Sequence, residues 1–142
     1  MNTDDIRTVT ALFDDINDKL MKTSQETLLN IYKDLTIAEA NAIYAIGPEG
    51  PKTMKEIAQA LGVAVSTPTR IIDRLLEKGF VSRSVGKEDR RKLLIELTPK
   101  GKKLVNDIDK ESLEVTKKML KDLSPEEIET FTQILLKISE NI

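Results

Sequence analysis

Residues 53–101 read TMKEIAQALGVAVSTPTRIIDRLLEKGFVSRSVGKEDRRKLLIELTPKG, and this stretch decides the fold. Its first part predicts a short helix, because Thr53 and Glu56 have the spacing of a capping box. In that motif the hydroxyl accepts a first-turn N–H and the carboxylate returns to the cap. Gly62 is suited to end the helix, since glycine readily adopts the conformation of a C-terminal cap. The apolar face consists of Ile57, Ala58 and Leu61.

A second short helix is predicted after a tight turn. Ser66 or Thr67 supplies a hydroxyl for its N-terminal cap, and Pro68 suits the first turn, where its missing N–H has no partner to lose. Lys78 and Gly79 are typical of a helix end. The apolar side of this helix consists of Ile71, Ile72, Leu75 and Leu76.

After Gly79 the apolar residues change from helical to alternating spacing, which predicts strands. Residues 80–85 and 92–97 form the two strands, and the charged residues 86–91 form the turn between them. We therefore expect a β-hairpin with a cationic tip. Two short helices joined by a tight turn and followed by a hairpin make a winged helix-turn-helix. The predicted fold class is mainly α with a small β-hairpin wing.

Helices are also predicted on the N-terminal side of this stretch. Apolar residues three and four apart predict a long helix that begins near residue 6 and a stripe that continues to residue 35. Polar residues 23–25 interrupt the stripe, so we expect either a bend or a locally polar face. Thr36 and Glu39 repeat the capping-box spacing and predict a second helix over residues 37–46. The first stripe begins with Ile6, Val9, Phe13, Ile16 and Leu20.

Two more helices are predicted on the C-terminal side, one with Pro99 in its first turn and one capped at Ser124. We expect a single domain over residues 1–142, with residues 36–100 as its winged helix-turn-helix part. The helices of residues 1–35 and 101–142 carry more apolar surface than so small a domain can cover, which favours dimerisation over a monomeric bundle. On the C-terminal side, the apolar stripe of the first helix is Leu104, Ile108, Val115 and Met119. The stripe of the last helix is Ile128, Phe131, Ile134, Leu135 and Ile138.

Composition excludes several classes of function. The chain has no cysteine and no histidine, so it lacks disulfides, thiolate metal sites, the usual general base and the commonest metal ligand. We therefore expect no enzyme, no catalytic residues, no cofactor and no metal site. No apolar run approaches the roughly 18–20 residues that cross a bilayer, and the acidic start is unlike a signal peptide. A cytoplasmic protein without a membrane partner is expected.

Charge is distributed unevenly along the chain. The net charge of the whole is −2, but residues 50–103 contain 13 Lys and Arg against 6 Asp and Glu, a net charge of +7. The remaining residues contain 9 basic against 18 acidic side chains, a net charge of −9. A basic middle between acidic ends indicates a surface that meets a polyanion. An uneven solvated surface is the alternative.

Several short motifs of the central stretch resemble those of one family. They are Ile57-Ala58, Leu61-Gly62, Thr69-Arg70, Asp73-Arg74-Leu75, Lys78-Gly79-Phe80-Val81, Asp89-Arg90-Arg91 and Leu97-Thr98-Pro99-Lys100-Gly101. In these motifs the chain resembles the MarR family of bacterial winged helix-turn-helix transcription regulators, and the resemblance extends over nearly the whole chain. It implies a homodimer that binds double-stranded DNA. Ala64, where members often have a capping hydroxyl, and Pro68 depart from the pattern.

In a helix-turn-helix the second helix enters the major groove, and residues near its N-terminus face the bases. Hydroxyls and a threonine methyl can contact base edges or phosphates, and Arg70 can donate to guanine. A capping role for Ser66 and Thr67 and a phosphate contact or plain surface position for Arg70 are the alternatives. Asp73 and Glu77 can instead pair with neighbouring cations. The predicted recognition-helix residues are Val65, Ser66, Thr67, Thr69, Arg70 and Arg74.

The hairpin tip supplies the second group of predicted DNA contacts, because a narrow minor groove attracts an inserted arginine. The family resemblance implies that Asp89 orients Arg91, which enters the groove, while Arg90 and Lys87 approach phosphates. A charged turn that serves solubility is the alternative. The predicted wing residues are Lys87, Asp89, Arg90, Arg91 and Lys92, and Lys100, Lys102 and Lys103 are candidates for further phosphate contacts.

The sequence thus predicts a sequence-specific transcription regulator, a repressor that binds a pseudo-palindromic operator as a homodimer. A winged-helix module that binds protein without sequence-specific DNA binding is the alternative. The resemblance also makes a small aromatic or phenolic compound a candidate effector that releases the DNA. Residues Tyr32, Tyr44, Phe13 and Met54 can line its pocket or simply belong to the core.

Overall fold

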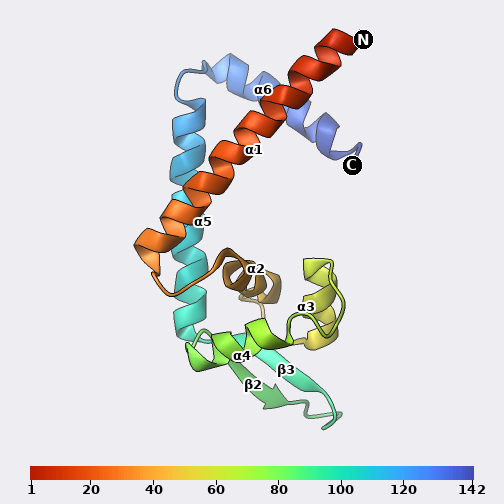
Figure 1. The fold of residues 1–142 in the computed structure, drawn as a ribbon, viewed down its shortest axis with the longest axis vertical. Helices are drawn as coiled ribbons and strands as arrows, with labels where there is room; N and C mark the ends of the chain where they lie inside the picture. Colours follow the sequence, from red (N-terminus) through yellow and green to blue (C-terminus); the bar gives the residue numbers. More distant parts are fainter. The chain divides into compact units, whose positions relative to one another are not determined.

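The computed structural model describes all 142 residues, and the predicted fold class is confirmed (Figure 1). The chain divides into two compact units, Met1–Asp107, called the N-terminal unit below, and Ile108–Ile142. The elements are α1 (Thr3–Ile31), α2 (Ile37–Ile46), β1 (Lys52–Thr53), α3 (Met54–Leu61), α4 (Thr69–Glu77), β2 (Val81–Val85), β3 (Leu93–Leu97), α5 (Pro99–Leu120) and α6 (Pro125–Ser139).

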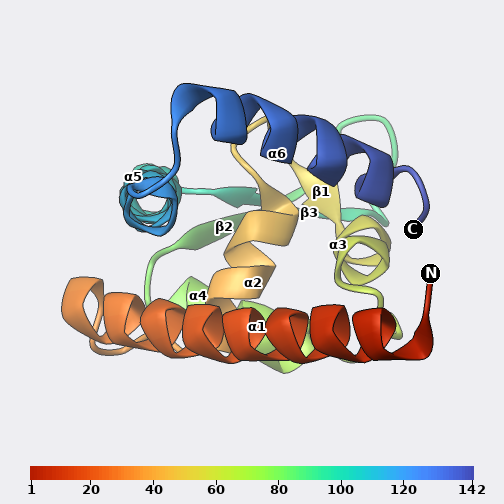
Figure 2. The ribbon, with the colours of Figure 1, turned by 90° about the horizontal axis from the view of Figure 1, so that it is seen from above.

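The core of the N-terminal unit forms around α2, which is apolar on nearly every side. Figure 2 shows α3 beside α2, and α4 and β3 also pack against α2. Because α2 is apolar over most of its surface, each of these elements can bury its own apolar face against it. The largest apolar side chains that are fully buried are Ile43, Ile46, Ile57, Leu75, Ile95 and Leu104.

The helix-turn-helix begins as the sequence predicts. Thr53 Oγ1 accepts from the amide of Glu56 at 3.2 Å, and the Glu56 carboxylate accepts from the amide of Thr53 at 3.4 Å, which completes the capping box. At the other end of α3, Gly62 has a φ of 69° and a ψ of 32°, the left-handed conformation that favours glycine. α3 is thus fixed at both ends by local interactions.

The start of α4 differs from the prediction. Its N-terminal cap is Pro68, and no side chain caps it, so the expected hydroxyl cap from Ser66 or Thr67 was wrong. The amide of Thr67 donates to the carbonyl of Ala64 at 3.0 Å and closes a separate turn. Since Pro68 has no N–H to donate, regular helical hydrogen bonding starts after it, with the amide of Ile72 on the Pro68 carbonyl at 2.9 Å.

The sheet has the strand order β1-β3-β2, and both pairings are antiparallel. The predicted hairpin of β2 and β3 is confirmed, with Val81 opposite Leu97 and Val85 opposite Leu93. β1 was not predicted, because two residues are too few to show alternating spacing. Through β1, Thr53 pairs with Leu94 and joins the start of α3 to the wing.

α1 is one continuous helix of 29 residues, drawn without a kink in Figure 1. The polar interruption is therefore a locally polar face: the hydroxyl of Thr23 donates to the Lys19 carbonyl at 2.9 Å, inside the helix. α1 ends at Ile31, and Leu35, which the sequence placed on the same stripe, lies buried in the connector to α2.

Of the three predicted outer stripes, those of α1 and α6 are largely exposed, whereas that of α5 is buried at Leu104 and half-buried at Ile108 and Val115. In α1, Phe13 is 52% exposed and only Leu28 is buried. α6 contains no buried residue, and the exposed fractions of its apolar side chains include 41% for Phe131 and 47% for Ile134. Its cap at Ser124 is confirmed as a capping box with Glu127. No helix of the structure has the length and apolar character needed to span a membrane.

Candidate nucleic-acid interface

The six residues predicted for the recognition helix all have exposed side chains. Val65, Ser66 and Thr67 lie in the turn that precedes α4, and Thr69, Arg70 and Arg74 lie in α4 itself. The opposite side of α4 is anchored in the core by Ile72 and Leu75, which are 3% and 0% exposed. This division leaves the predicted contact side chains free to meet a ligand without disturbing the core.

The charges of α4 are not neutralised within the helix. Asp73 and Glu77 form no ion pair with Arg70 or Arg74, and the ammonium of Lys78 pairs with Glu39 of α2 instead. The alternative in which Asp73 and Glu77 form ion pairs with the arginines of α4 is therefore absent from the structure. Both guanidinium groups remain available for a partner.

The wing tip is held in a defined shape by backbone hydrogen bonds. The amide of Gly86 donates to the Lys92 carbonyl at 2.9 Å, and the amide of Lys92 donates to the Asp89 carbonyl at 3.1 Å. A Cβ atom on Gly86 would lie 2.6 Å from that same Asp89 carbonyl oxygen, closer than real Cβ contacts. The turn therefore requires glycine at this position.

Asp89 and Arg91 form a two-pronged ion pair at the tip. Asp89 Oδ1 accepts from the Arg91 amide at 3.0 Å and from Nε at 3.1 Å, and Oδ2 accepts from the second guanidinium nitrogen at 3.3 Å. These hydrogen bonds from Arg91 hold the pKa of Asp89 below its ordinary value of 3.8, and nearby Lys92 lowers the pKa further. The side chain of Arg91 is 92% exposed. The carboxylate thus fixes the direction of an arginine that remains open to solvent.

The other wing residues are exposed cations. Lys87, Arg90 and Lys92 surround the ion pair, and none of them forms a salt bridge. Figure 1 shows α4 and the β2–β3 hairpin at the same end of the N-terminal unit, away from the start of α1. α4 also packs against β2. The two groups of predicted contact residues therefore belong to adjoining elements at one end of the unit.

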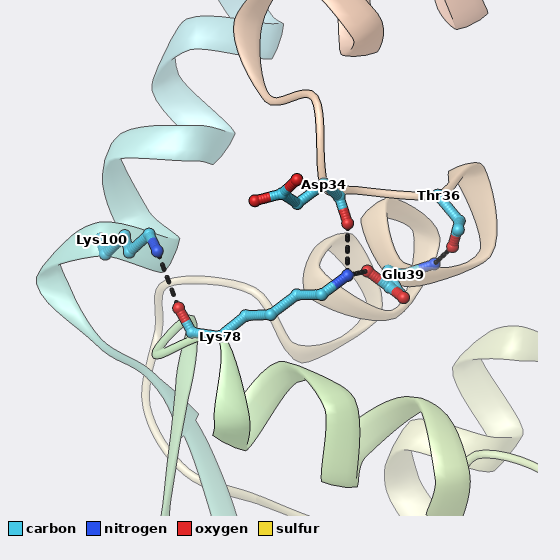
Figure 3. Close-up of polar contacts among 5 residues, drawn as sticks. All are labelled: Asp34, Thr36, Glu39, Lys78 and Lys100. Carbon is cyan, nitrogen blue, oxygen red and sulfur yellow. Dashed lines mark hydrogen bonds and ion pairs between the residues drawn. The ribbon is translucent and has the colours of Figure 1, made fainter.

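An ion pair that the sequence did not predict joins the C-terminal end of α4 to α2 (Figure 3). Glu39 is 2% exposed, and its Oε2 lies 2.7 Å from the ammonium of Lys78, which also donates to the carbonyl of Asp34. The hydroxyl of Thr36 accepts from the amide of Glu39 at 3.1 Å, but the carboxylate does not return to the cap. The predicted capping box is therefore wrong in its second half, because a buried carboxylate gains more from a cation than from an amide. In the sequence, the one sign of this ion pair is Glu39 itself, an acidic residue within the mostly apolar α2.

Lys100 is exposed, but its ammonium is engaged by other groups of the protein. Its ammonium donates to the Lys78 carbonyl at 2.7 Å and lies 4.5 Å from the centre of the Phe80 ring. Both contacts compete with the phosphate contact proposed for Lys100 from the sequence. Beside it, Thr98 Oγ1 donates to the Gly79 carbonyl at 2.6 Å and accepts from the Gly101 amide at 3.2 Å. The end of α4 and the start of α5 are thus joined by hydrogen bonds.

A small cavity lies next to these groups. It has a volume of about 150 Å³ and lies beside the Tyr32 and Phe80 rings, which meet edge to face with their centres 5.6 Å apart. Of the four residues considered for a ligand pocket, Tyr32 lines it, whereas Phe13, Tyr44 and Met54 do not. The lining residues are Tyr32, Lys33, Asp34, Leu35, Lys78, Phe80 and Lys100.

Comparison with known proteins identifies the family of the chain. Residues 35–93 match the family described as MarR family. The chain is 32% identical to YfiV and 36% identical to YwoH of Bacillus subtilis (strain 168), both described as uncharacterized HTH-type transcriptional regulators. Each match covers 66% of this chain, and they cover 59% of YfiV and 68% of YwoH.

The fold is also found in a solved structure. The chain resembles Streptococcus pneumoniae FabT, crystallised in complex with DNA, with a TM-score of 0.85, 23% sequence identity and 95% of each chain covered. At that identity the likeness concerns the fold. The family match covers the helix-turn-helix and the wing as far as β3, and YwoH exceeds 30% identity over two thirds of its length. The chain therefore belongs to the MarR family.

Proposed function

We propose that this chain is a sequence-specific transcription regulator that binds double-stranded DNA through α4 and the wing. The observation that carries the proposal is the exposed cationic surface at one end of the N-terminal unit. It consists of Arg70 and Arg74 on α4, which form no ion pair, and of Arg91 at the tip of the adjoining hairpin, which Asp89 holds while its side chain stays 92% exposed. The proposal places the exposed side of α4 in the major groove and Arg91 in the neighbouring minor groove. FabT, which has the same fold, was crystallised in complex with DNA, which supports DNA as the partner of this chain.

The proposal extends to a homodimer that represses transcription from a pseudo-palindromic operator. Exposed apolar stripes on α1 and α6 support self-association, because contiguous apolar surface of this kind is rare on a monomer. A two-fold dimer presents two copies of α4, which fit two half-sites about one helical turn apart. A bound dimer of this size would occupy the DNA that polymerase needs, which is the physical basis of the proposed repression.

Release by an aromatic or phenolic effector is the last part of the proposal. The cavity beside Tyr32 and Phe80 has ammonium groups and ring edges that suit an aromatic anion. Its volume of about 150 Å³ is small compared with the ~300 Å³ of ordinary ligand sites, so binding would require the cavity to widen. A thermal-shift titration with hydroxybenzoates tests this part: a raised melting temperature together with weaker DNA binding supports it, and no shift at millimolar ligand rejects it.

Binding to DNA is tested by fluorescence anisotropy on duplexes selected by the protein from a random-sequence library. A regulator should enrich a two-fold symmetric sequence and bind it more tightly than a shuffled duplex. The logarithm of the association constant should fall linearly with the logarithm of the salt concentration, with a slope of about −0.9 for each phosphate contacted. Binding that does not depend on salt, or a selection that enriches nothing, would reject the proposal.

A further inference from the structure

The C-terminal end of α4 is fastened to three other segments by polar contacts. The Lys78 ammonium binds the Glu39 carboxylate of α2 at 2.7 Å and the Asp34 carbonyl in the connector between α1 and α2. The carbonyl of Lys78 accepts from Lys100 in the first turn of α5 at 2.7 Å. Figure 3 shows these contacts converging on the one lysine. No comparable polar contact holds the other end of α4, where no side chain caps the helix.

The pair is sheltered from solvent on the Glu39 side. Glu39 is the one charged residue in the buried set, at 2% exposure, and the side chain of Lys78 is 29% exposed. A buried ion pair adds little net stability over two apolar side chains of the same volume, because both charges must give up their hydration. What such a pair does provide is a fixed geometry, since the charges tolerate only a narrow range of positions. Its presence here therefore indicates a geometric role.

The geometry that it fixes is the direction of α4. Lys78 is the C-terminal cap of α4, with its amide on the Arg74 carbonyl at 3.0 Å, so the contacts of its ammonium and its carbonyl act directly at the end of the helix. Asp34 lies three residues beyond the end of α1, and Lys100 lies in the first turn of α5. The three contacts therefore set how α4 is oriented relative to the segments that continue into both long helices.

We propose that Glu39 and Lys78 are positioning residues that orient α4 and thereby set the distance between half-sites on which two copies of the chain can dock. This inference rests on the proposed function. Without the pair, α4 would retain its apolar anchoring through Ile72 and Leu75 but would sample a range of directions. Only a fraction of dimers would then match the DNA at any moment, and the apparent affinity falls in proportion to that fraction.

The test uses the double variant Glu39→Met, Lys78→Met in the full chain. It removes both charges and leaves no unpaired ion, so it should fold with a stability close to that of the parent. The probes are the duplex that the parent protein selects and two derivatives whose half-sites are one base pair closer or farther apart. We expect the double variant to bind the selected duplex about tenfold more weakly, as for a docking orientation populated ~10% of the time, and to discriminate less among the three spacings.

Lys117→Met is the matched control, because its ion pair with Glu114 joins side chains that are 73% and 58% exposed. It should leave both affinity and spacing preference as in the parent protein. If the double variant does not fold, Lys78→Arg takes its place, since arginine keeps the charge but cannot keep the same contacts with a larger, planar group. The expected result is then a changed order of preference among the three spacings.

The outcomes separate the inference from the function on which it rests. A folded double variant with the parent's affinity and spacing preference overturns the inference, as does an unchanged spacing profile in Lys78→Arg if that variant has to be used. A parent protein that binds DNA but ignores spacing also overturns it and leaves DNA binding intact. A parent protein that binds no duplex overturns the proposed function, and the inference with it.

Discussion

Arg91 is the wing arginine whose direction is fixed, because the Asp89 carboxylate accepts from two of its guanidinium nitrogens and leaves the side chain 92% exposed. We predict that Arg91→Ala weakens binding to the selected duplex about tenfold or more and lowers the salt slope by about one. Arg7→Ala, which removes the same charge from α1, is the control and should change little. Equal effects of the two variants in anisotropy titrations would show that Arg91 acts only through net charge.

The same ion pair makes a prediction about pH. Because Arg91 lowers the pKa of Asp89 below 3.8, the pair is fully formed above that value and is lost as the pH falls through the lowered pKa. An NMR titration of the Asp89 carboxyl should give a midpoint below 3.8 in the parent protein and a higher one in Arg91→Ala, which loses the guanidinium and keeps the amide donor. A midpoint unaffected by the substitution would mean that the pair is not formed in solution.

Gly101 shows how a single residue controls the packing of α5. A Cβ atom here would overlap the Phe80 carbonyl oxygen and lie 3.3 Å from Leu97 Cβ. Alanine would gain about 1 kcal/mol of helix propensity, but overpacking typically costs 1–3 kcal/mol, roughly, so the clash should win. We predict that Gly101→Ala lowers the free energy of unfolding in urea by up to about 2 kcal/mol. A stabilised variant would contradict this packing.

At the scale of elements, α3 and α4 differ in how their first turns are held. Thr53→Ala removes a capping hydroxyl from α3 and should cost about 1 kcal/mol of unfolding free energy. Thr67→Ala should change stability by less than about 0.5 kcal/mol, because α4 has no side-chain cap and Thr67 is exposed. Urea unfolding measures both. Similar losses in the two variants would indicate that Thr67 does cap α4.

Elements were predictable wherever local chemistry alone decides them. The capping pair Thr53 and Glu56 and the left-handed Gly62 gave the bounds of α3 from sequence, since each acts on its own neighbours. Prediction failed where a distant partner or a conflict decided the outcome. The carboxylate of Glu39 left its expected cap for Lys78, which is 39 residues away, and Pro68 removed the hydrogen bond that the expected start of α4 needed.

At the scale of the whole molecule, the exposed stripe of α6 predicts assembly. Introducing a charge by Phe131→Glu should convert a dimer into a folded monomer, because the Phe131 side chain is 41% exposed and is not part of the core of the monomer. Gln133→Glu, two residues along and on the opposite face of the helix, is the matched control and should stay dimeric. Sedimentation equilibrium measures the mass, and circular dichroism checks the fold. A monomeric parent protein would reject the dimer.

The sequence names the residues of the candidate interface but not their geometry. The motif residues Asp89 and Arg91 were identified from sequence, and the structure pairs them; their role on DNA stays a prediction. The contacts at the C-terminal end of α4 were not predicted. From the sequence, Lys78 was a helix-end residue and Lys100 a candidate phosphate contact, and only the folded chain brings them to Glu39 and Phe80.

The two-residue strand β1 has a mechanical consequence. Thr53 is at once the last residue of β1, paired with Leu94 of the hairpin, and the cap that starts α3. No loop separates the sheet from α3, so no flexible segment can absorb a displacement of one relative to the other. A displacement of the hairpin toward a DNA groove therefore displaces the start of α3 with it, so the wing and α3 move together and not independently.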